Sequence, residues 1–216
     1  MSPAATRAAG EAVSHRYGPR VALQPVSFDF RGPGVVAVTG ENGSGKSTLL
    51  RILAGLLRPS AGATTLEVAG AAVPPAARRL HVGLATPELS FYEEFTAREN
   101  LEFAASARGL TNVQVAVSQA LEETGLAPRA ADRVAAFSSG MKQRLRLAFA
   151  VLHTPPILML DEPGSHLDAE GRSVVERLVH GHAADGLVVI ATNEPQEMQL
   201  AERRIELSGR GLDHPA

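Results

Sequence analysis

The feature that most constrains this chain is the stretch GENGSGKST at residues 40–48. It has the G-x-x-x-x-G-K-S spacing of a phosphate-binding loop. The apolar, β-branched run at 35–39 predicts a buried strand before the loop, and leucines at helical spacing predict a helix after it that ends near Leu57. A strand, a loop and a helix in this order are the context that the motif requires, so the sequence predicts a P-loop nucleoside triphosphatase core.

The residue types of this loop account for phosphate binding. Its glycines allow backbone N–H groups to turn inward, and the following helix contributes its N-terminus to the same anion site. Lys46 can place its charge on the β- and γ-phosphates, and the Ser47 hydroxyl can hold Mg²⁺. The alternative is a glycine-rich turn that ends in lysine by chance. That alternative does not explain the strand pattern before the loop or the helix pattern after it. The residues expected to bind the nucleotide here are Asn42, Gly43, Ser44, Gly45, Lys46, Ser47 and Thr48.

Composition restricts the class of protein. Hydrophobic residues make up 44% of the 216 residues and charged residues 20%, as in an ordinary soluble globular protein. The net charge of −2 argues against a nucleic-acid partner, and the absence of cysteine excludes disulfides and thiolate metal sites. No apolar run approaches the roughly 20 residues of a membrane helix. We therefore expect a single domain over 1–216, located in the cytoplasm, that reaches a membrane only through a partner.

The order of predicted elements indicates an α/β fold with a mainly parallel sheet covered on both faces. Strand-type residues at 13–17 and 21–30 predict an N-terminal antiparallel β subdomain, preceded by a loose leader at 1–11. Residues 86–152 are mostly helical in pattern and predict a lobe inserted into the nucleotide-binding core. Arg78 and its neighbour Arg79 are expected on a solvated face or in ion pairs.

A second motif combines an apolar strand with acidic residues. Residues 157–160 read ILML and are followed by Asp161 and Glu162. Ligand sites in open α/β sheets lie at the carboxyl ends of the strands, where these side chains should be. Asp161 suits the Mg²⁺ shell because a hard cation prefers oxygen ligands, and Glu162 can orient an attacking water or accept its proton. Two acids that only cap a strand are the alternative.

A third motif places two serines and a glycine before a helix. Ser138, Ser139 and Gly140 open a helical pattern that runs to about Leu152. A helix start of this kind can bind an anion, but an ordinary serine N-cap explains the local pattern equally well.

In this order, the motifs resemble those of the ATP-binding subunit of an ABC transporter, over residues 11–208. Residues 138–144 are similar to the family's signature motif and residues 165–168 to its D-loop, while Tyr17 stands where an aromatic ring stacks on adenine. The resemblance implies ATP and Mg²⁺ as cofactors. It also implies a head-to-tail dimer, with an identical or a related subunit, in which Ser138, Ser139, Gly140 and Asp168 close on the partner's nucleotide.

The resemblance further implies ATP hydrolysis that drives a separate membrane permease, with the subunit held through it on the inner face of the plasma membrane. The stretch at 92–101 is similar to that of compact exporter cassettes such as the haem-exporter ATPase of cytochrome c biogenesis. Two alternatives stay open: a soluble ABC-type ATPase without a transport role, and a weakly hydrolysing regulatory cassette. A GTPase is disfavoured because no N-K-x-D motif is present.

Besides Ser139 and Met141, which stand where the signature motif usually has Gly and Gln, two departures from the family pattern affect the predicted site. Glu88 stands where the family has a glutamine, and Asn193 follows Thr192 where the family has a histidine. We expect Glu88 to act as an extra ligand of Mg²⁺. We expect Asn193 to act in catalysis, beside Lys46 and Glu162, by donating a hydrogen bond to the γ-phosphate, because an asparagine amide is a donor that does not titrate.

Overall fold

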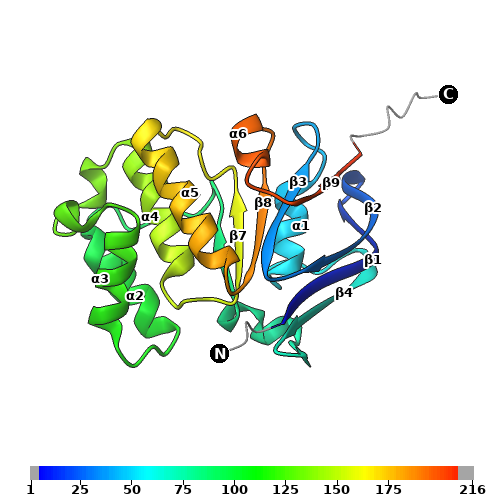
Figure 1. Ribbon diagram of the computed structural model, residues 1–216, viewed down its shortest axis with the longest axis horizontal. Coiled ribbons are helices and arrows are strands. Elements are labelled where there is room, and N and C mark those ends of the chain that lie inside the picture. The colour runs from blue at the N-terminus through cyan, green and yellow to red at the C-terminus, as the bar shows by residue number, and fades with distance from the viewer. Residues whose placement is uncertain (1–4, 209–216) are drawn as a thin grey trace.

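The computed structural model describes residues 5–208, in which a parallel sheet lies between a layer of helices and an antiparallel sheet (Figure 1). The parallel sheet has five strands in the order β6-β7-β8-β3-β9. Their bounds are Val82–Ala85 for β6, Ile157–Asp161 for β7, Leu187–Ala191 for β8, Gly34–Thr39 for β3 and Arg203–Glu206 for β9. Every neighbouring pair is parallel, so all five carboxyl ends meet at one edge.

Alternate residues of the central strands face two different cores. Leu158 and Leu160 of β7 pack against the helices, while Ile157 and Met159 of the same strand face the antiparallel sheet. All four side chains are fully buried. Because both faces of the parallel sheet are covered, its strands are continuously apolar, which is the pattern that the sequence shows.

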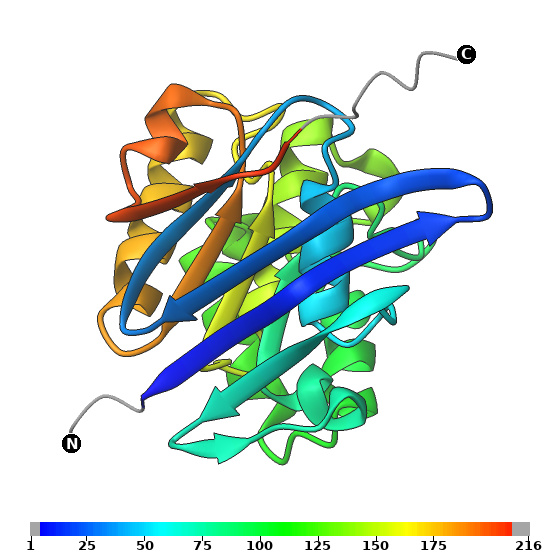
Figure 2. The ribbon, with the colours of Figure 1, turned by 90° about the vertical axis from the view of Figure 1, so that its right-hand side faces the viewer.

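The antiparallel sheet has the order β2-β1-β4-β5 and packs over α1 (Lys46–Leu53), as Figure 2 shows. Its strands are β1 (Thr6–Tyr17), β2 (Arg20–Arg31), β4 (Ala61–Val68) and β5 (Ala71–Ala72). The loose leader predicted at 1–11 is wrong over 6–11, which forms the first half of β1; residues 1–4 lie outside the described residues. This alanine-rich segment pairs with β2 on one side and β4 on the other, which stabilises it as a strand. Its low strand propensity is the reason that the sequence did not predict a strand there.

The predicted helical lobe is present beside the parallel sheet (Figure 1). It contains α2 (Ala97–Ala107), α3 (Val113–Glu123), the short 3₁₀ helices η2 (Ala127–Arg129) and η3 (Val134–Ala136), and α4 (Ser139–Val151). Thr96 and Glu99 form a capping box at the start of α2. The remaining helices are η1 (Pro75–Leu80), α5 (Ala169–Ala183) and α6 (Pro195–Met198). The predicted fold class is therefore confirmed.

The region after α1 differs from two predictions. The helix ends at Leu53 rather than near Leu57, because Gly55 takes a φ of +77° and turns the chain away. Arg78 is only 2% exposed, so its predicted place on a solvated face is wrong. Its guanidinium donates to the carbonyls of Ile52 and Leu53, both at 3.2 Å, and to Thr64. A buried cation thus caps the C-terminus of α1, where the helix dipole favours positive charge.

Among residues 5–208, every helix is too short or too polar to span a bilayer.

Candidate functional site

The three predicted groups of site residues meet at the carboxyl edge of the parallel sheet. The phosphate loop follows β3, Asp161 ends β7 with Glu162 directly after it, and Asn193 lies after β8. Beside the loop lies a cavity of about 330 Å³. It is lined by Tyr17, Arg20, Ala22, Asn42, Gly43, Gly45, Lys46, Ser47, Thr48 and Glu162. The parallel sheet therefore brings together residues that are more than 100 positions apart in the sequence.

The phosphate loop has the backbone that its glycines predict. Gly43 and Gly45 have φ angles of +86° and +103°, and a Cβ at Gly45 would lie 2.5 Å from the Ala22 carbonyl oxygen. Only glycine fits this close approach. The Lys46 side chain is 6% exposed, and its Nζ donates to the carbonyls of Gly40 at 2.7 Å and Glu41 at 3.3 Å. These hydrogen bonds hold the ammonium against the phosphate loop, where it is expected to bind phosphate.

Asp161 is the most strongly perturbed acid of the site. It is 2% exposed, and burial raises its pKa to about 6, while a hydrogen bond with the Ser47 side chain opposes that rise. Its Oδ2 atom has no hydrogen-bond partner among the described residues. A buried carboxylate oxygen without a partner, next to a hydroxyl, is an oxygen donor set that suits Mg²⁺. The residues present therefore fit the expected ion.

Glu162 directs its carboxylate at the cavity from a strained backbone. Its φ is +48°, a region that residues other than glycine rarely adopt and that is enriched at functional sites. The Glu162 N–H donates to the Ala191 carbonyl at 2.9 Å, which ties the end of β7 to β8. The Ser165 hydroxyl lies 3.4 Å from Glu162 Oε2. The side chain itself is exposed and lines the cavity beside the phosphate loop.

Asn193 lies against the phosphate loop from the β8 side. Its Oδ1 accepts a hydrogen bond from the Gly40 N–H at 3.3 Å, and its Nδ2 donates to Asn42 Oδ1 at 3.4 Å. Both contacts are long, and the side chain is exposed. Asn193 therefore lies where a hydrogen bond to a bound phosphate is expected, while its catalytic role stays a prediction.

Glu88 pairs with another residue in this structure. Its carboxylate forms an ion pair with Arg51 of α1, and 60% of its side chain is exposed. It lies near enough to Asp161 to contribute to the raised pKa of that residue. Over residues 5–208, however, histidines and acids do not gather into a cluster of three that could hold a metal. The predicted role of Glu88 as a metal ligand stays a prediction.

The four residues expected to close on a partner's nucleotide do not line the cavity of their own chain. The Ser138 hydroxyl accepts from the Met141 N–H at 3.2 Å and caps α4, which is the alternative that the local sequence left open. Asp168 caps α5 by accepting from the Gly171 N–H at 2.8 Å. Ser138 and Ser139 are exposed at the start of α4, and Gly140 is half-buried. By contrast, Tyr17 lines the cavity with a ring that is 47% exposed.

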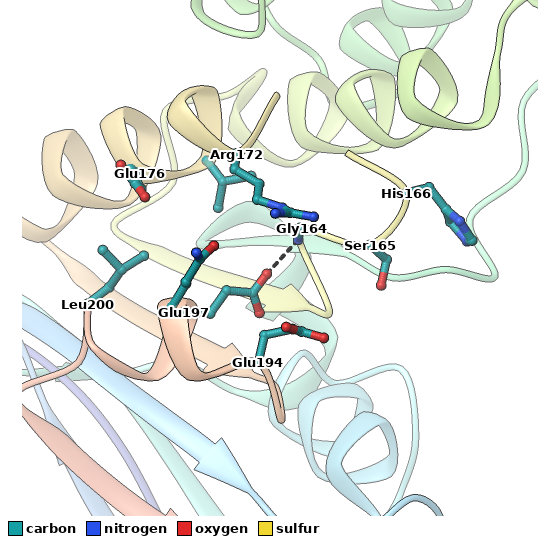
Figure 3. A pocket seen from close by; sticks show the side chains of 10 residues that line it. Gly164, Ser165, His166, Arg172, Glu176, Glu194, Glu197 and Leu200 are labelled. Carbon is teal, nitrogen blue, oxygen red and sulfur yellow. Dashed lines mark hydrogen bonds between the residues drawn. The ribbon is translucent and has the colours of Figure 1, made fainter. Parts of the chain in front are cut away.

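Two contacts to the loop after β7 were not predicted from the sequence. Gln143 of α4 is 2% exposed, and its Nε2 donates to the carbonyls of Glu162 at 3.3 Å and Pro163 at 3.0 Å. Glu197 of α6 is 7% exposed, and its Oε1 accepts from the Gly164 N–H at 2.6 Å (Figure 3). For Gln143 a weak signal exists, because it shares a helix face with the buried Leu147. Glu197 lies in a segment too short to show a period.

Comparison with known sequences agrees with this geometry. The profile of the family described as ABC transporter matches residues 23–165. The cytochrome c biogenesis ATP-binding export protein CcmA of Rhodopseudomonas palustris (strain BisB5) is 33% identical over 198 residues, which cover 87% of this chain and 92% of that protein. The linearmycin resistance ATP-binding protein LnrL of Bacillus subtilis (strain 168) is 30% identical over 189 residues, 87% of this chain and 61% of that protein. These matches confirm the resemblance drawn from the motifs.

Solved structures agree as well. The dimeric structure of a bacterial ABC transporter cassette matches with a TM-score of 0.82 at 22% identity, over 93% of this chain and 94% of that chain. At this identity the likeness shows the fold. The chain spans 54% to 63% of the length of the first curated relatives that it matches, which are longer proteins.

Proposed function

The chain belongs to the ABC transporter family, and from that premise we propose that it binds Mg²⁺–ATP and hydrolyses it to drive a separate membrane permease. One observation carries the proposal: the phosphate loop and Glu162 line one cavity, and the buried Asp161 lies beside Ser47 of that loop. The relatives named above are ATP-binding proteins of export and resistance systems.

The chain's own residues supply positioning and electrostatics for phosphoryl transfer. The loop N–H groups and the Lys46 ammonium hold the β- and γ-phosphates. Ser47 and Asp161 would hold Mg²⁺, which would supply positive charge to the phosphate oxygens. Glu162 orients a water and takes its proton as the water oxygen bonds to the γ-phosphorus. The bond to the β-phosphate oxygen breaks, which gives ADP and phosphate. Asn193 Nδ2 turns from Asn42 to a γ-phosphate oxygen.

A second cassette completes the site in this proposal. Ser138, Ser139 and Gly140 lie at the N-terminus of α4 and do not line the cavity of their own chain. Their hydroxyls and the helix N-terminus suit a phosphate presented by another subunit. We therefore assign them, with Asp168, to the nucleotide of an identical or related partner cassette that dimerises when ATP is bound.

The helical lobe offers a surface for the permease. Tyr92, Phe95 and Phe103 are 56%, 45% and 59% exposed, and the Tyr92 ring lies 5.5 Å from the Phe95 ring and 5.9 Å from the Phe103 ring. An exposed aromatic cluster of this kind marks an interaction site. In the proposal a cytoplasmic segment of the permease packs here, which holds the subunit at the inner face of the plasma membrane.

The test of ATP binding uses the two lysines of the chain. Lys46→Ala removes the cation from the phosphate loop, so we expect Mg²⁺–ATP binding, measured by calorimetry, to fall below detection while the circular dichroism spectrum stays unchanged. Lys142→Ala is the matched control, because that ammonium pairs with Glu93 at 2.5 Å on the helical lobe. Equal ATP affinity in the parent and in Lys46→Ala would overturn the proposed site.

A further inference from the structure

Glu197 places a buried carboxylate against the loop that carries Glu162. It lies on α6, and its Oε1 accepts the Gly164 N–H at 2.6 Å, which is short for a hydrogen bond to nitrogen and typical of one to a charged acceptor (Figure 3). A Cβ at Gly164 would lie 2.5 Å from that same oxygen. The loop and the carboxylate thus approach as closely as they do only because residue 164 is glycine.

This carboxylate is poorly explained by stability alone. Glu197 is 7% exposed, and among residues 5–208 it has no basic partner within ion-pair distance. Its Oε2 has no hydrogen-bond partner in the same part of the chain. Burial raises the pKa of Glu197, while the nearby Thr192 hydroxyl and the Gly164 N–H oppose the rise. The charges of Glu194 and Glu162 raise the pKa further. A buried acid without a counter-charge is costly, and an apolar side chain of similar size would cost less.

The contact lies in the centre of the catalytic segment. Gly164 is two residues after Glu162 and one before Ser165, whose hydroxyl faces the Glu162 carboxylate. From the opposite side, Gln143 of α4 holds the carbonyls of Glu162 and Pro163. The loop is therefore held between two helices, by a donor from α4 and an acceptor from α6.

The same contact joins two predicted catalytic side chains. α6 begins at Pro195, two residues after Asn193, so a bond from Glu197 to Gly164 ties the segment after β8 to the segment after β7. In the proposed function, Asn193 donates to the γ-phosphate and Glu162 orients the water that attacks it. The hydrogen bond from the Gly164 N–H to the Glu197 side chain would limit changes in the distance between these two segments.

We propose that Glu197 is a positioning residue that orients Glu162 and holds it in register with Asn193 through its hydrogen bond to Gly164. This inference rests on the proposed function. Glu197 does not touch the nucleotide; it acts on the reaction through the peptide that carries Glu162. Misplacing a catalytic group by about 1 Å can cost about 10²-fold in rate, so the loss of this bond should reduce turnover.

Two substitutions separate the acceptor from the side-chain volume. Glu197→Gln keeps a carbonyl oxygen for the Gly164 N–H, so we expect its kcat within about 3-fold of the parent. Glu197→Met fills the same space without an acceptor, so we expect kcat to fall about 10-fold to 100-fold with the KM for ATP unchanged. Glu197 and Glu176 both line a second cavity, of about 260 Å³, beside the loop after β7 (Figure 3). Glu176→Met is the matched control, because Glu176 lines this cavity from α5 but is exposed.

The outcomes distinguish this inference from the proposed function. Amide hydrogen exchange of residues 162–168 should be faster in Glu197→Met and should stay slow in Glu197→Gln and Glu176→Met. A parent protein without ATP turnover would overturn the proposed function itself. If the parent hydrolyses ATP and Glu197→Met matches its kcat, the positioning role is wrong. Equal losses in the Gln and Met variants, or a KM that rises with the loss of kcat, would overturn it as well.

Discussion

Two aspartates, one in each sheet of the molecule, have pKa values displaced in opposite directions. Asp29 of β2, on the antiparallel sheet, accepts hydrogen bonds from Arg7 at 2.8 Å and Arg31 at 2.7 Å, and these arginines lower its pKa to about 2. Asp161, at the end of β7, is raised to about 6 by burial, and one of its oxygens is without a partner in residues 5–208.

The difference separates a structural acid from a binding acid. Asp29 has positive partners within the chain, whereas Asp161 lies beside Ser47 with one carboxylate oxygen that has no partner in residues 5–208, as a proposed metal ligand would. A folded protein tolerates such a group at one edge because the rest of the parallel sheet is apolar and well packed. Substitutions at that edge should therefore reduce activity strongly, and substitutions around Asp29 should change stability slightly.

The largest effect is expected at Glu162. Glu162→Gln keeps the shape of the side chain but removes the proton acceptor, so ATP turnover should fall about 10²-fold to 10⁴-fold. Nucleotide binding should be retained, and a dimer should accumulate with ATP in size-exclusion chromatography. Turnover of Glu162→Gln equal to that of the parent would place the proton acceptor elsewhere and weaken the contrast between the two sheets.

The next effect is expected at Asn193. Asn193→Ala removes a donor aimed at developing charge, so turnover should fall about 10²-fold, while Asn193→His should retain or raise activity. The parent should show no histidine step in its rate between about pH 6 and 8 that belongs to this position. The rate of phosphate release, measured for the parent and both variants across this pH range, tests all three expectations.

Glu88 provides the control for Asn193. Its carboxylate lies near Asp161 and pairs with Arg51, so it can alter the metal site independently. The Ala and His variants of Asn193 should therefore be compared in the parent and in Glu88→Gln. If Asn193→Ala hydrolyses ATP as fast as the parent in both backgrounds, Asn193 has no catalytic role, and Lys46, Mg²⁺ and Glu162 are sufficient.

The site was more predictable from the sequence than the contacts that support it. The phosphate loop and the acids at 161 and 162 are local patterns, and parallel strands necessarily carry them to one edge. The bond between Glu197 and Gly164 joins residues 33 positions apart through one side chain, and no periodicity records such a contact. The prediction for Arg78 was wrong for a similar reason. Its partners are the carbonyls left without helical partners where α1 ends, and the apolar pattern predicted that end too far along the chain.

A smaller effect, on stability, is expected at Arg78. Arg78→Met removes hydrogen bonds to the carbonyls that end α1 and leaves them buried, so the free energy of unfolding should fall by about 2 kcal/mol. Urea denaturation measures this value. Arg79→Met is the matched control, because Arg79 is exposed and donates only to the nearby Ala76 carbonyl at 2.8 Å. Equal losses in both variants would mean that the buried cap contributes nothing specific.

The smallest effect is expected at Asp29, whose carboxylate is 38% exposed. Asp29→Asn keeps an acceptor oxygen but loses the charge, and solvent screening limits the loss of unfolding free energy at pH 7 to about 0.5 kcal/mol. Because the folded pKa is lowered to about 2, this stabilisation is present above the unfolded pKa of about 4 and is lost as the pH falls through 2.

Chemical denaturation at pH 7, 3 and 2 should therefore show the parent and Asp29→Asn converging in acid, and 1 M salt should bring them closer at pH 7. ATP turnover at pH 7 should be equal in the two proteins, since Arg7, Arg31 and Asp29 lie on the antiparallel sheet and do not line the cavity. A loss of turnover in Asp29→Asn without loss of stability would show that this ion-pair cluster acts on the site, and the division between a structural and a binding acid would then fail.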